Sequence, residues 1–317
     1  MSEESQPRML WMDVVRGAAI LAVIAFHSVT FLERYDFEAN MVWRQMNESL
    51  SLYRMPILVF LSGMLLTRSL AKPAPEFLSG KIRAILWPFL LWSTVYGVVA
   101  GVDLTSLYQL RTLYIGGSHL WFLAFIFVYY VVAKPLESVN PLIIATCAFL
   151  LAIISPDGAK YSERILYLMA LFFLGGAISG HTNGIVRVLR SQQVWFLLPV
   201  IAASSLLTVL YDLNFGPSWV IISVTGILFF SSIALRIETL ALSKPLIWIG
   251  QRAIVFFVSH AIFIMIVGRM AEAGGVENYP AVASISIVTS LVCGWALAVG
   301  MDRSSLIAWL FRFPKQT

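Results

Sequence analysis

Long apolar stretches alternate with short polar breaks along the whole chain. Each apolar stretch has roughly 16–24 residues, near the length that an α-helix needs to cross a hydrocarbon core. The stretches are continuously apolar, which favours helices over a β-barrel, whose strands alternate lipid-facing and lumen-facing residues. The pattern therefore predicts an all-α, polytopic helical bundle with about ten transmembrane helices. The expected spans are 10–32, 49–68, 84–101, 119–135, 141–155, 162–180, 194–211, 218–235, 246–268 and 280–301.

Positive charges are distributed unevenly between the polar breaks. If the N-terminus is cytoplasmic, thirteen Lys and Arg residues fall on the inner side, six on the outer side and three within spans. The positive-inside rule then places both termini in the cytoplasm. The inner set is Arg8, Arg68, Lys72, Lys81, Arg83, Lys134, Arg187, Arg190, Arg236, Lys244, Arg303, Arg312 and Lys315, and the outer set is Arg34, Arg44, Arg111, Lys160, Arg164 and Arg269.

Composition supports an integral membrane protein. The 317 residues are 59% hydrophobic and 12% charged, with a mean hydropathy of +0.82. The polar loops are too short to fold alone, so we expect a cytoplasmic segment over 1–9, a transmembrane domain over 10–301 and a basic cytoplasmic tail over 302–317. The hydrophilic start MSEESQPR lacks the layout of a cleavable signal peptide, so the first helix is expected to remain as an anchor.

The net charge of +5 and the pI near 9.3 follow from the same charge asymmetry. The basic residues form no aromatic-interleaved patch that would bind nucleic acid, so anionic membrane lipid is the expected partner. Cys147 and Cys293 both lie within expected spans, which favours buried thiols over a disulfide. The oligomeric state stays open.

The first apolar stretch carries Arg16 and His27 with ten residues between them. Eleven steps of about 100° complete three turns plus roughly 20°, so both side chains share one helix face, roughly 16 Å apart along the axis. Ionisable residues at bilayer depth usually face a bundle interior or a wet cavity and mark a functional pathway. Asp13 precedes Arg16 by three residues, so the two charges either pair or extend to the cytoplasmic interface.

His27 lies in the outward half of this helix. Imidazole exchanges a proton near neutral pH, as acyl transfer to a hydroxyl requires, although a helix-packing hydrogen bond is the alternative role. In the second span Arg54 stands just before Pro56, which frees a backbone carbonyl and is tolerated beside a cavity. Arg54 either holds an anionic or polyhydroxyl ligand or extends to the outer interface.

The remaining candidates begin or interrupt later spans. By depth they fall into a cytoplasmic set suited to phosphate and an outer set suited to proton transfer, with His260 near the middle. Cations at the cytoplasmic mouth and Trp at the outer interface are also expected from topology alone. The cytoplasmic set is Arg16, Lys81, Arg83 and Arg252, and the outer set is His27, Arg54 and His119, with Trp121 beside His119 at the outer interface. Ser259 shares a helix face with Arg252, and His181 alone lies in a loop.

Five sequence blocks carry these residues. They are Arg16 and His27 with ten residues between them, RMP...FLSG from Arg54 to Gly63, KIRAILWPF from Lys81 to Phe89, HLWFL from His119 to Leu123, and IGQRAIVFFVSH ending at His260. In order and spacing along residues 9–265 the blocks resemble the membrane acyltransferase-3 family, whose members O-acetylate glycans at the bacterial cell envelope. The chain is most similar to standalone members such as the fucose 4-O-acetylase-like enzymes, because it lacks the long segment of members with an extracytoplasmic esterase-like domain. Arg54 is one departure, because members of the family are expected to have His or another polar residue at this position as often as Arg. The role of Arg54 therefore stays open.

The resemblance implies an O-acyltransferase of the bacterial inner membrane that uses acyl-CoA, commonly acetyl-CoA, and gives Arg16 and His27 an essential role. We expect His27 to act as general base on a hydroxyl of a cell-envelope glycan or lipid-linked sugar, or to carry the acetyl group itself. No metal is predicted. The residues expected near the donor phosphates are Lys81, Arg83 and Arg252, and those expected to bind the acceptor or the oxyanion are Arg54, His119, Trp121, Ser259 and His260.

Two other classes of protein remain in the comparison. A transporter or flippase of a glycan or metabolite also needs buried Arg and His, but the internal repeats that many carriers show are not visible here. A non-enzymatic membrane scaffold has no use for five polar constellations at bilayer depth, whose burial is unfavourable. The acceptor and the acyl chain length stay open.

Overall fold

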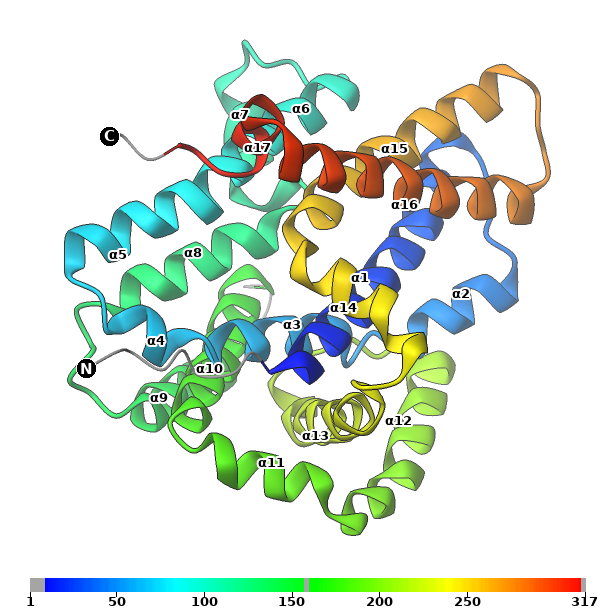
Figure 1. Cartoon of the computed structure of the whole chain (residues 1–317). Helices are drawn as coiled ribbons and strands as arrows, with labels where there is room; N and C mark the ends of the chain where they lie inside the picture. Colours follow the sequence, from blue (N-terminus) through cyan, green and yellow to red (C-terminus); the bar gives the residue numbers. More distant parts are fainter. Residues whose placement is uncertain (1–8, 157–159, 315–317) are drawn as a thin grey trace.

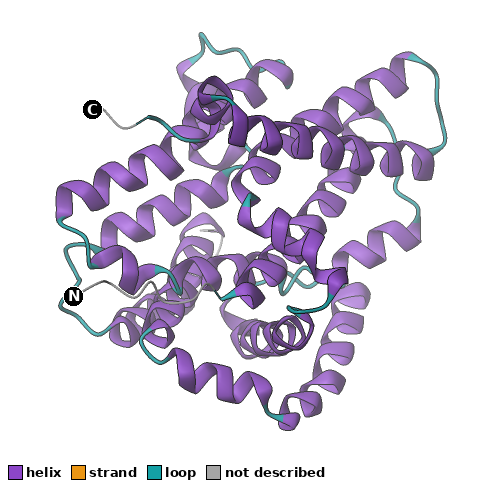
Figure 2. Cartoon of the chain, in the orientation of Figure 1, coloured by secondary structure: helices purple, strands orange, loops and turns teal. Residues whose placement is uncertain are grey.

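The computed structural model describes residues 9–156 and 160–314, so Arg8 and Lys315 of the charge count lie outside the described residues. Within these ranges the regular structure is entirely helical (Figure 2). The helices are α1 Leu10–Thr30, α2 Met41–Glu48, α3 Arg54–Gly63, α4 Leu66–Leu70, α5 Ala74–Lys81, α6 Trp87–Val99, α7 Leu107–Thr112, α8 Trp121–Ala133, α9 Pro141–Ile153, α10 Lys160–Ser179, α11 Thr182–Arg190, α12 Leu198–Tyr211, α13 Val220–Ile237, α14 Lys244–Gln251, α15 Ala253–Ala273, α16 Tyr279–Arg303 and α17 Ser305–Phe311.

The prediction of a helical membrane bundle is confirmed. Among the described residues, seven helical stretches are long and apolar enough to cross a membrane. The expected count of about ten is not reached, because the segments expected at 49–68, 119–135 and 141–155 form helices of only 10, 13 and 13 residues. The seven stretches are Leu10–Tyr35, Ala74–Val99, Tyr161–Ser179, Gln192–Tyr211, Pro217–Ile237, Ala253–Ala273 and Tyr279–Arg303.

The third span begins ten residues earlier than the expected 84–101. Helix α5 continues into α6 through a wide π-helical turn at Ile82–Leu86. Pro88 follows this turn and has no N–H to donate to the preceding carbonyls, and a wider turn avoids the clash of its ring with them. Lys81 consequently lies inside a long helix and not in a loop.

Helix α1 runs through the middle of the bundle and packs against α3, α13, α14 and α15 (Figure 1). Two glycines allow α14 to approach α1 closely. A Cβ on Gly250 would lie 1.9 Å from the Asp13 carbonyl oxygen, and one on Gly17 would lie 2.1 Å from that of Leu246. Small residues are the usual means by which membrane helices bring their backbones together.

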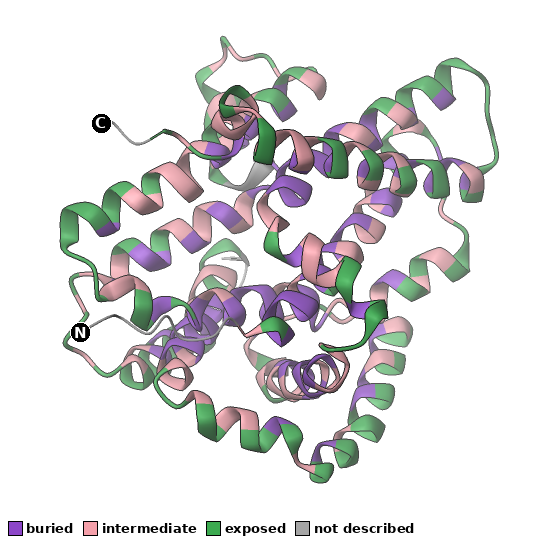
Figure 3. Cartoon of the chain, in the orientation of Figure 1, coloured by how far each residue is buried: buried purple, intermediate pink, exposed green. Residues whose placement is uncertain are grey.

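The same device joins α3 to α10, where a Cβ on Gly63 would lie 1.9 Å from the Phe172 carbonyl oxygen. Most residues of α3 are buried, whereas the outer helices expose apolar side chains (Figure 3). The short helix α3 is therefore an interior element of the bundle. A polar residue at either of its ends faces protein or a cavity.

The ninth expected span, 246–268, is not one continuous helix. Arg252 separates α14 from α15 with φ −116° and ψ 23°, and its N–H bonds to the Ile249 carbonyl. The close contact of Gly250 with α1 fixes α14 in place, so α15 starts with a new direction at Ala253.

Part of the expected basic tail is also helical. Helix α17 packs against α6, where the indole nitrogens of Trp87 and Trp92 donate to the carbonyls of Trp309 and Leu310. The Trp92 and Phe311 rings stack with centroids 5.4 Å apart. Residues 305–311 are therefore part of the folded bundle.

Candidate active site

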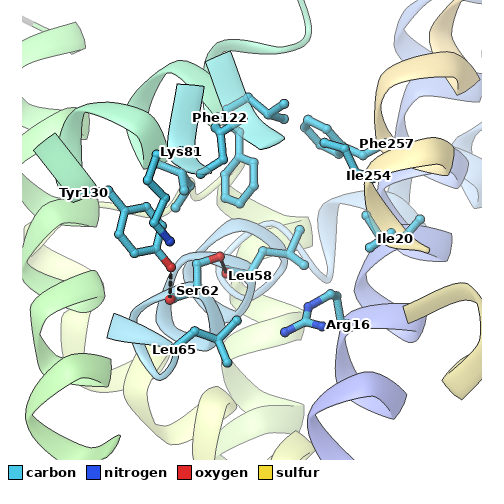
Figure 4. A pocket seen from close by; sticks show the side chains of 14 residues that line it. Arg16, Ile20, Leu58, Ser62, Leu65, Lys81, Phe122, Tyr130, Ile254 and Phe257 are labelled. Atoms are coloured by element: carbon cyan, nitrogen blue, oxygen red, sulfur yellow. Dashed lines mark hydrogen bonds between the residues drawn. The ribbon is translucent and has the colours of Figure 1, made fainter. Parts of the chain in front are cut away.

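Two cavities lie along α1, one at Arg16 and one at His27. The Arg16 cavity has a volume of about 210 Å³ and is mostly apolar, with Arg16 and Lys81 extending into it from opposite walls (Figure 4). The His27 cavity has a volume of about 350 Å³ and contains more polar side chains. The shared helix face predicted for Arg16 and His27 thus leads from one cavity to the other.

Arg16 forms the ion pair that its spacing from Asp13 predicts, with 3.1 Å between Nη1 and Oδ1. The same nitrogen is 3.5 Å from the Gly250 carbonyl oxygen on α14. Asp13 is buried, so the pair is shielded from solvent on one side. Because α14 approaches this closely, the guanidinium is oriented toward the cavity and not toward the end of the helix.

Lys81 faces Arg16 across the cavity. Its Nζ donates to Ser69 Oγ at 2.9 Å and lies 3.4 Å from the centroid of the Tyr130 ring. Tyr130 in turn donates to the Ser62 carbonyl at 2.9 Å. The face of an aromatic ring attracts a cation. Lys81 is thus held at the Tyr130 ring on the wall of the Arg16 cavity.

The structure does not bring the other two expected phosphate-binding residues to this cavity. Arg83 donates through Nε to the Phe313 carbonyl at 2.7 Å and holds the C-terminal segment. Arg252 pairs with Asp302, with 2.6 Å between Nη2 and Oδ2, and lies over the Trp248 ring. Neither residue is among those that line the Arg16 cavity.

Three of the four histidines meet at the other end of α1. The His27 ring centroid lies 5.1 Å from that of His260 and 6.1 Å from that of His119, and the last two are 5.2 Å apart. The described part of the chain contains no group of His, Cys, Asp or Glu side chains placed to hold a metal ion. Within the cluster the His27 and His260 rings stack, and the His119 ring lies edge-on to both.

The histidines differ in their hydrogen bonds. His27 Nδ1 lies 3.4 Å from Thr30 Oγ1, and His260 Nδ1 lies 3.1 Å from the Phe256 carbonyl oxygen. His260 Nε2 and both ring nitrogens of His119 have no partner of ordinary geometry among the described residues, apart from a weak backbone interaction of His119 with Val258. His27 and His119 line the cavity.

Local structure explains how His119 reaches this position. The chain before α8 is extended at Ser118, whose hydroxyl accepts a hydrogen bond from the Leu120 N–H at 3.3 Å. This side-chain bond replaces a helical one and delays the start of α8 to Trp121. His119 consequently lies just before α8, and this short helix begins beside the cavity. Irregular backbone inside a membrane is tolerated where it borders a cavity.

Arg54 is the first residue of α3. Pro56 lies in the first turn of α3, so the interruption expected in the middle of the second span is instead the start of a helix. The Arg54 guanidinium lies over the Phe26 ring at 4.2 Å, and only 8% of the residue is exposed. Its Nη1 is buried without a hydrogen-bond partner among the described residues, and the side chain lines the His27 cavity.

Two further predicted residues have different surroundings. Trp121 lines the His27 cavity, as its place beside His119 suggests. Ser259 is buried, and its hydroxyl donates to the Val255 carbonyl of the same helix at 2.8 Å, so it is not aimed at either cavity. The exposed His181 lies at the start of α11, away from the histidine cluster.

Sequence reasoning missed the residues at the rim of the His27 cavity. Glu48, Asp212 and Arg164 come from the polar breaks or from a helix end, and all three line the cavity. Partial burial and the neighbouring Asp212 carboxylate raise the pKa of Glu48 above its ordinary value, against the opposing effect of Arg44. No periodic pattern marks these positions, because only tertiary packing brings their segments together.

Phe257 on α15 lines both cavities and separates them. Its ring centroid lies 5.3 Å from that of Phe122, which lines the Arg16 cavity, and 6.5 Å from that of His119. One aromatic side chain therefore stands between the cation-lined space and the histidine-lined space.

Fold and site together define a multi-pass membrane protein in which a cationic cavity and an imidazole-lined cavity share one helix. The comparison with known families identifies its class: the family described as "Acyltransferase domain" matches residues 9–299, and the chain belongs to this membrane acyltransferase-3 family. The resemblance seen in the sequence blocks is thereby confirmed, and the protein is an enzyme that transfers acyl groups. No curated protein and no solved structure matches the chain.

Proposed function

We propose that the protein moves an acyl group, acetyl in the first instance, from acyl-CoA at the Arg16 cavity to a hydroxyl of a cell-envelope glycan or lipid-linked sugar at the His27 cavity. The observation that carries this proposal is the placement of Arg16 and His27 on one helix, in two cavities divided by Phe257. A donor with anionic phosphates suits the side with Arg16 and Lys81, and proton transfer suits the side with His27. With both termini cytoplasmic, in the bacterial inner membrane, the donor enters from the cytosol.

His27 acts as the general base. Thr30 occupies the neighbourhood of Nδ1, which leaves Nε2 available to the acceptor hydroxyl. Nε2 takes the hydroxyl proton as the oxygen attacks the thioester carbonyl, and a C–O bond forms. The oxyanion then collapses, the C–S bond breaks, and the imidazolium returns its proton to the departing CoA thiolate.

Arg54 and His119 stabilise the oxyanion. Both line the His27 cavity; among the described residues Arg54 Nη1 has no hydrogen-bond partner, and His119 has only a backbone interaction with Val258. Such preorganised donors gain strength where water is excluded. The hydroxyl of Ser259, the third candidate for this role, donates within its own helix. Among the expected phosphate-binding residues, Lys81 shares the cavity with Arg16, whereas Arg83 bonds to the C-terminal segment and Arg252 pairs with Asp302.

The test is acetyl transfer in cells that lack the native gene and carry His27→Ala or Arg16→Ala. Acetyl ester on the envelope glycan, measured by mass spectrometry, is expected to fall by a factor of about 10² or more, while expression and membrane insertion are unchanged. His181→Ala is the matched control, because this imidazole is exposed and remote from the cluster. Wild-type acetylation by the His27→Ala protein would overturn the proposal.

A further inference from the structure

The rim of the His27 cavity carries charged residues from three separate segments. Glu48 ends α2, Arg164 lies near the start of α10, and Asp212 follows α12. Together with Arg54 they are the charged residues that line this cavity among those described, apart from the histidines. Two carboxylates and two guanidinium groups therefore face one space, and their formal charges cancel.

The segment after α2 is tied to the loop that carries Asp212, because Ser51 Oγ donates to the Leu213 carbonyl at 2.6 Å. Within that loop Asn214 Nδ2 donates to the Asp212 carbonyl oxygen at 3.3 Å. Asp212 itself is held in the left-handed region, with φ 49°. These contacts fix Asp212 close enough to Glu48 for its charge to influence that carboxyl group. The two carboxylates are neighbours in a built rim.

An aromatic wall completes the rim. The Arg164 guanidinium carbon lies 5.2 Å from the Trp121 ring centroid and 5.5 Å from the Phe215 ring centroid. The Arg164 guanidinium is therefore placed between two aromatic faces at the rim. Asp212 is exposed, whereas Trp121 and Phe215 are half-buried.

A buried guanidinium group also lines this cavity. Arg54 is more than nine-tenths buried, its Nη1 has no partner among the described residues, and it lines this same space. Leaving a buried donor unpaired is unfavourable, so such groups point to a polar ligand. The interior of the cavity therefore favours a ligand with oxygen acceptors. The residues at the rim select among such ligands.

We propose that Glu48 and Asp212 form an acceptor subsite that accepts hydrogen bonds from the hydroxyls of an uncharged sugar ring, with Trp121 and Phe215 as its apolar wall. The inference rests on the proposed transfer to a glycan and names the class of sugar that receives the group. Ionised carboxylates accept hydrogen bonds from several hydroxyls at once. Their charges balance those of Arg54 and Arg164, so the cavity has no net charge that would favour a sugar bearing a carboxylate or phosphate over an uncharged one.

The experiment uses the full-length enzyme in lipid vesicles with ¹⁴C-labelled acetyl-CoA and envelope glycans from cells that lack the gene. Tandem mass spectrometry of a parallel unlabelled reaction identifies the sugar that gains the acetyl group. We expect an uncharged hexose or deoxyhexose. Glu48→Gln and Asp212→Asn are expected to raise the acceptor KM about tenfold or more while the KM for acetyl-CoA stays the same.

Glu38→Gln is the matched control, because Glu38 is exposed in the loop before α2 and lines neither cavity. Acetylation of a uronic acid or a phosphorylated sugar, or an unchanged acceptor KM in both variants, would overturn the subsite. If the wild-type enzyme transfers no acetyl group to any glycan fraction, the proposed function itself fails, and that outcome is distinct from failure of the subsite. An unchanged KM for acetyl-CoA also shows that the variants are folded.

Discussion

The contacts of single residues show which of the sequence candidates lie in a cavity and which bind elsewhere. The ion pair of Asp13 with Arg16 follows from a spacing of three residues on one helix, and the structure forms it. Arg83 and Arg252 had the same character in the sequence, but their partners are the Phe313 carbonyl and the Asp302 carboxylate, both distant along the chain. Local spacing predicts contacts within a helix, whereas a partner fifty or more residues away depends on the fold.

Arg54 is the residue whose surroundings change most between sequence and structure. The sequence left two roles open for it: binding an anionic or polyhydroxyl ligand, or extending to the outer interface. The structure instead buries it over Phe26 in the His27 cavity, with one guanidinium nitrogen unpaired among the described residues.

We expect Arg54→Gln to lower kcat by about 10²–10³, because it removes a preorganised donor from the developing oxyanion. Arg54→Lys keeps the charge but loses the planar fork of donors, so its kcat is expected to lie between those of the wild type and Arg54→Gln. Steady-state rates of acetyl transfer give kcat and KM separately. Arg44→Gln, which removes a cation paired with Glu33 outside both cavities, is the control. A raised KM with an unchanged kcat in Arg54→Gln would assign Arg54 to binding alone.

At the scale of helices, hydropathy located the elements but not their ends. The apolar runs predict which segments are helical, since their backbone must satisfy its own hydrogen bonds in lipid. They do not predict the break at Arg252 or the early start of the third span, because both depend on contacts: α14 against α1, and the π-helical turn before Pro88. These two deviations determine which cations reach the Arg16 cavity.

The contact of α14 with α1 can be tested through its glycines. Gly250→Ala places a Cβ against the Asp13 carbonyl, and a backbone atom cannot yield as a flexible side chain would. We expect a loss of about 1–3 kcal/mol in the free energy of unfolding. Acetyl transfer is expected to fall as well, because the helix that orients Arg16 is displaced.

Gly80→Ala is the matched control, since nothing lies within 4 Å of its added Cβ and alanine favours the helix. Thermal denaturation of the purified enzyme in detergent compares the two variants. Equal midpoints for Gly250→Ala and Gly80→Ala would show that the close approach of α14 to α1 does not contribute to stability.

At the scale of the whole molecule, the site arises from convergence that the sequence only suggests. The histidines of the cluster come from α1, from the segment before α8 and from α15, and α1 packs directly against α15. Helical spacing placed Arg16 and His27 on one face, but it could not show that His119 and His260 approach the same end. The rim carboxylates were beyond prediction, because α2 meets the loop after α12 only in the folded bundle.

The two cavities fit the proposed transfer from a donor on one side to an acceptor on the other. Phe257 is common to both linings, and its ring packs against that of Phe122, which lines the Arg16 cavity. In the proposed reaction a thioester has to pass this ring to reach His27, and water on the acceptor side has to be kept from the donor. We therefore expect the ring to couple thioester cleavage to acetyl transfer.

We expect Phe257→Ala to uncouple the reaction, because removing the ring joins the cavities and gives water access to the thioester. The ratio of CoA released to acetyl transferred, which is close to one in a coupled transferase, should rise several-fold, with release continuing when acceptor is omitted. Phe256→Ala is the control: its ring packs on Trp248 and at Gly294 and lines neither cavity, so it loses similar packing, about 3–5 kcal/mol for a buried Phe. Equal ratios in the two variants would mean that Phe257 contributes only packing, and that water is excluded by the acceptor or by another part of the bundle.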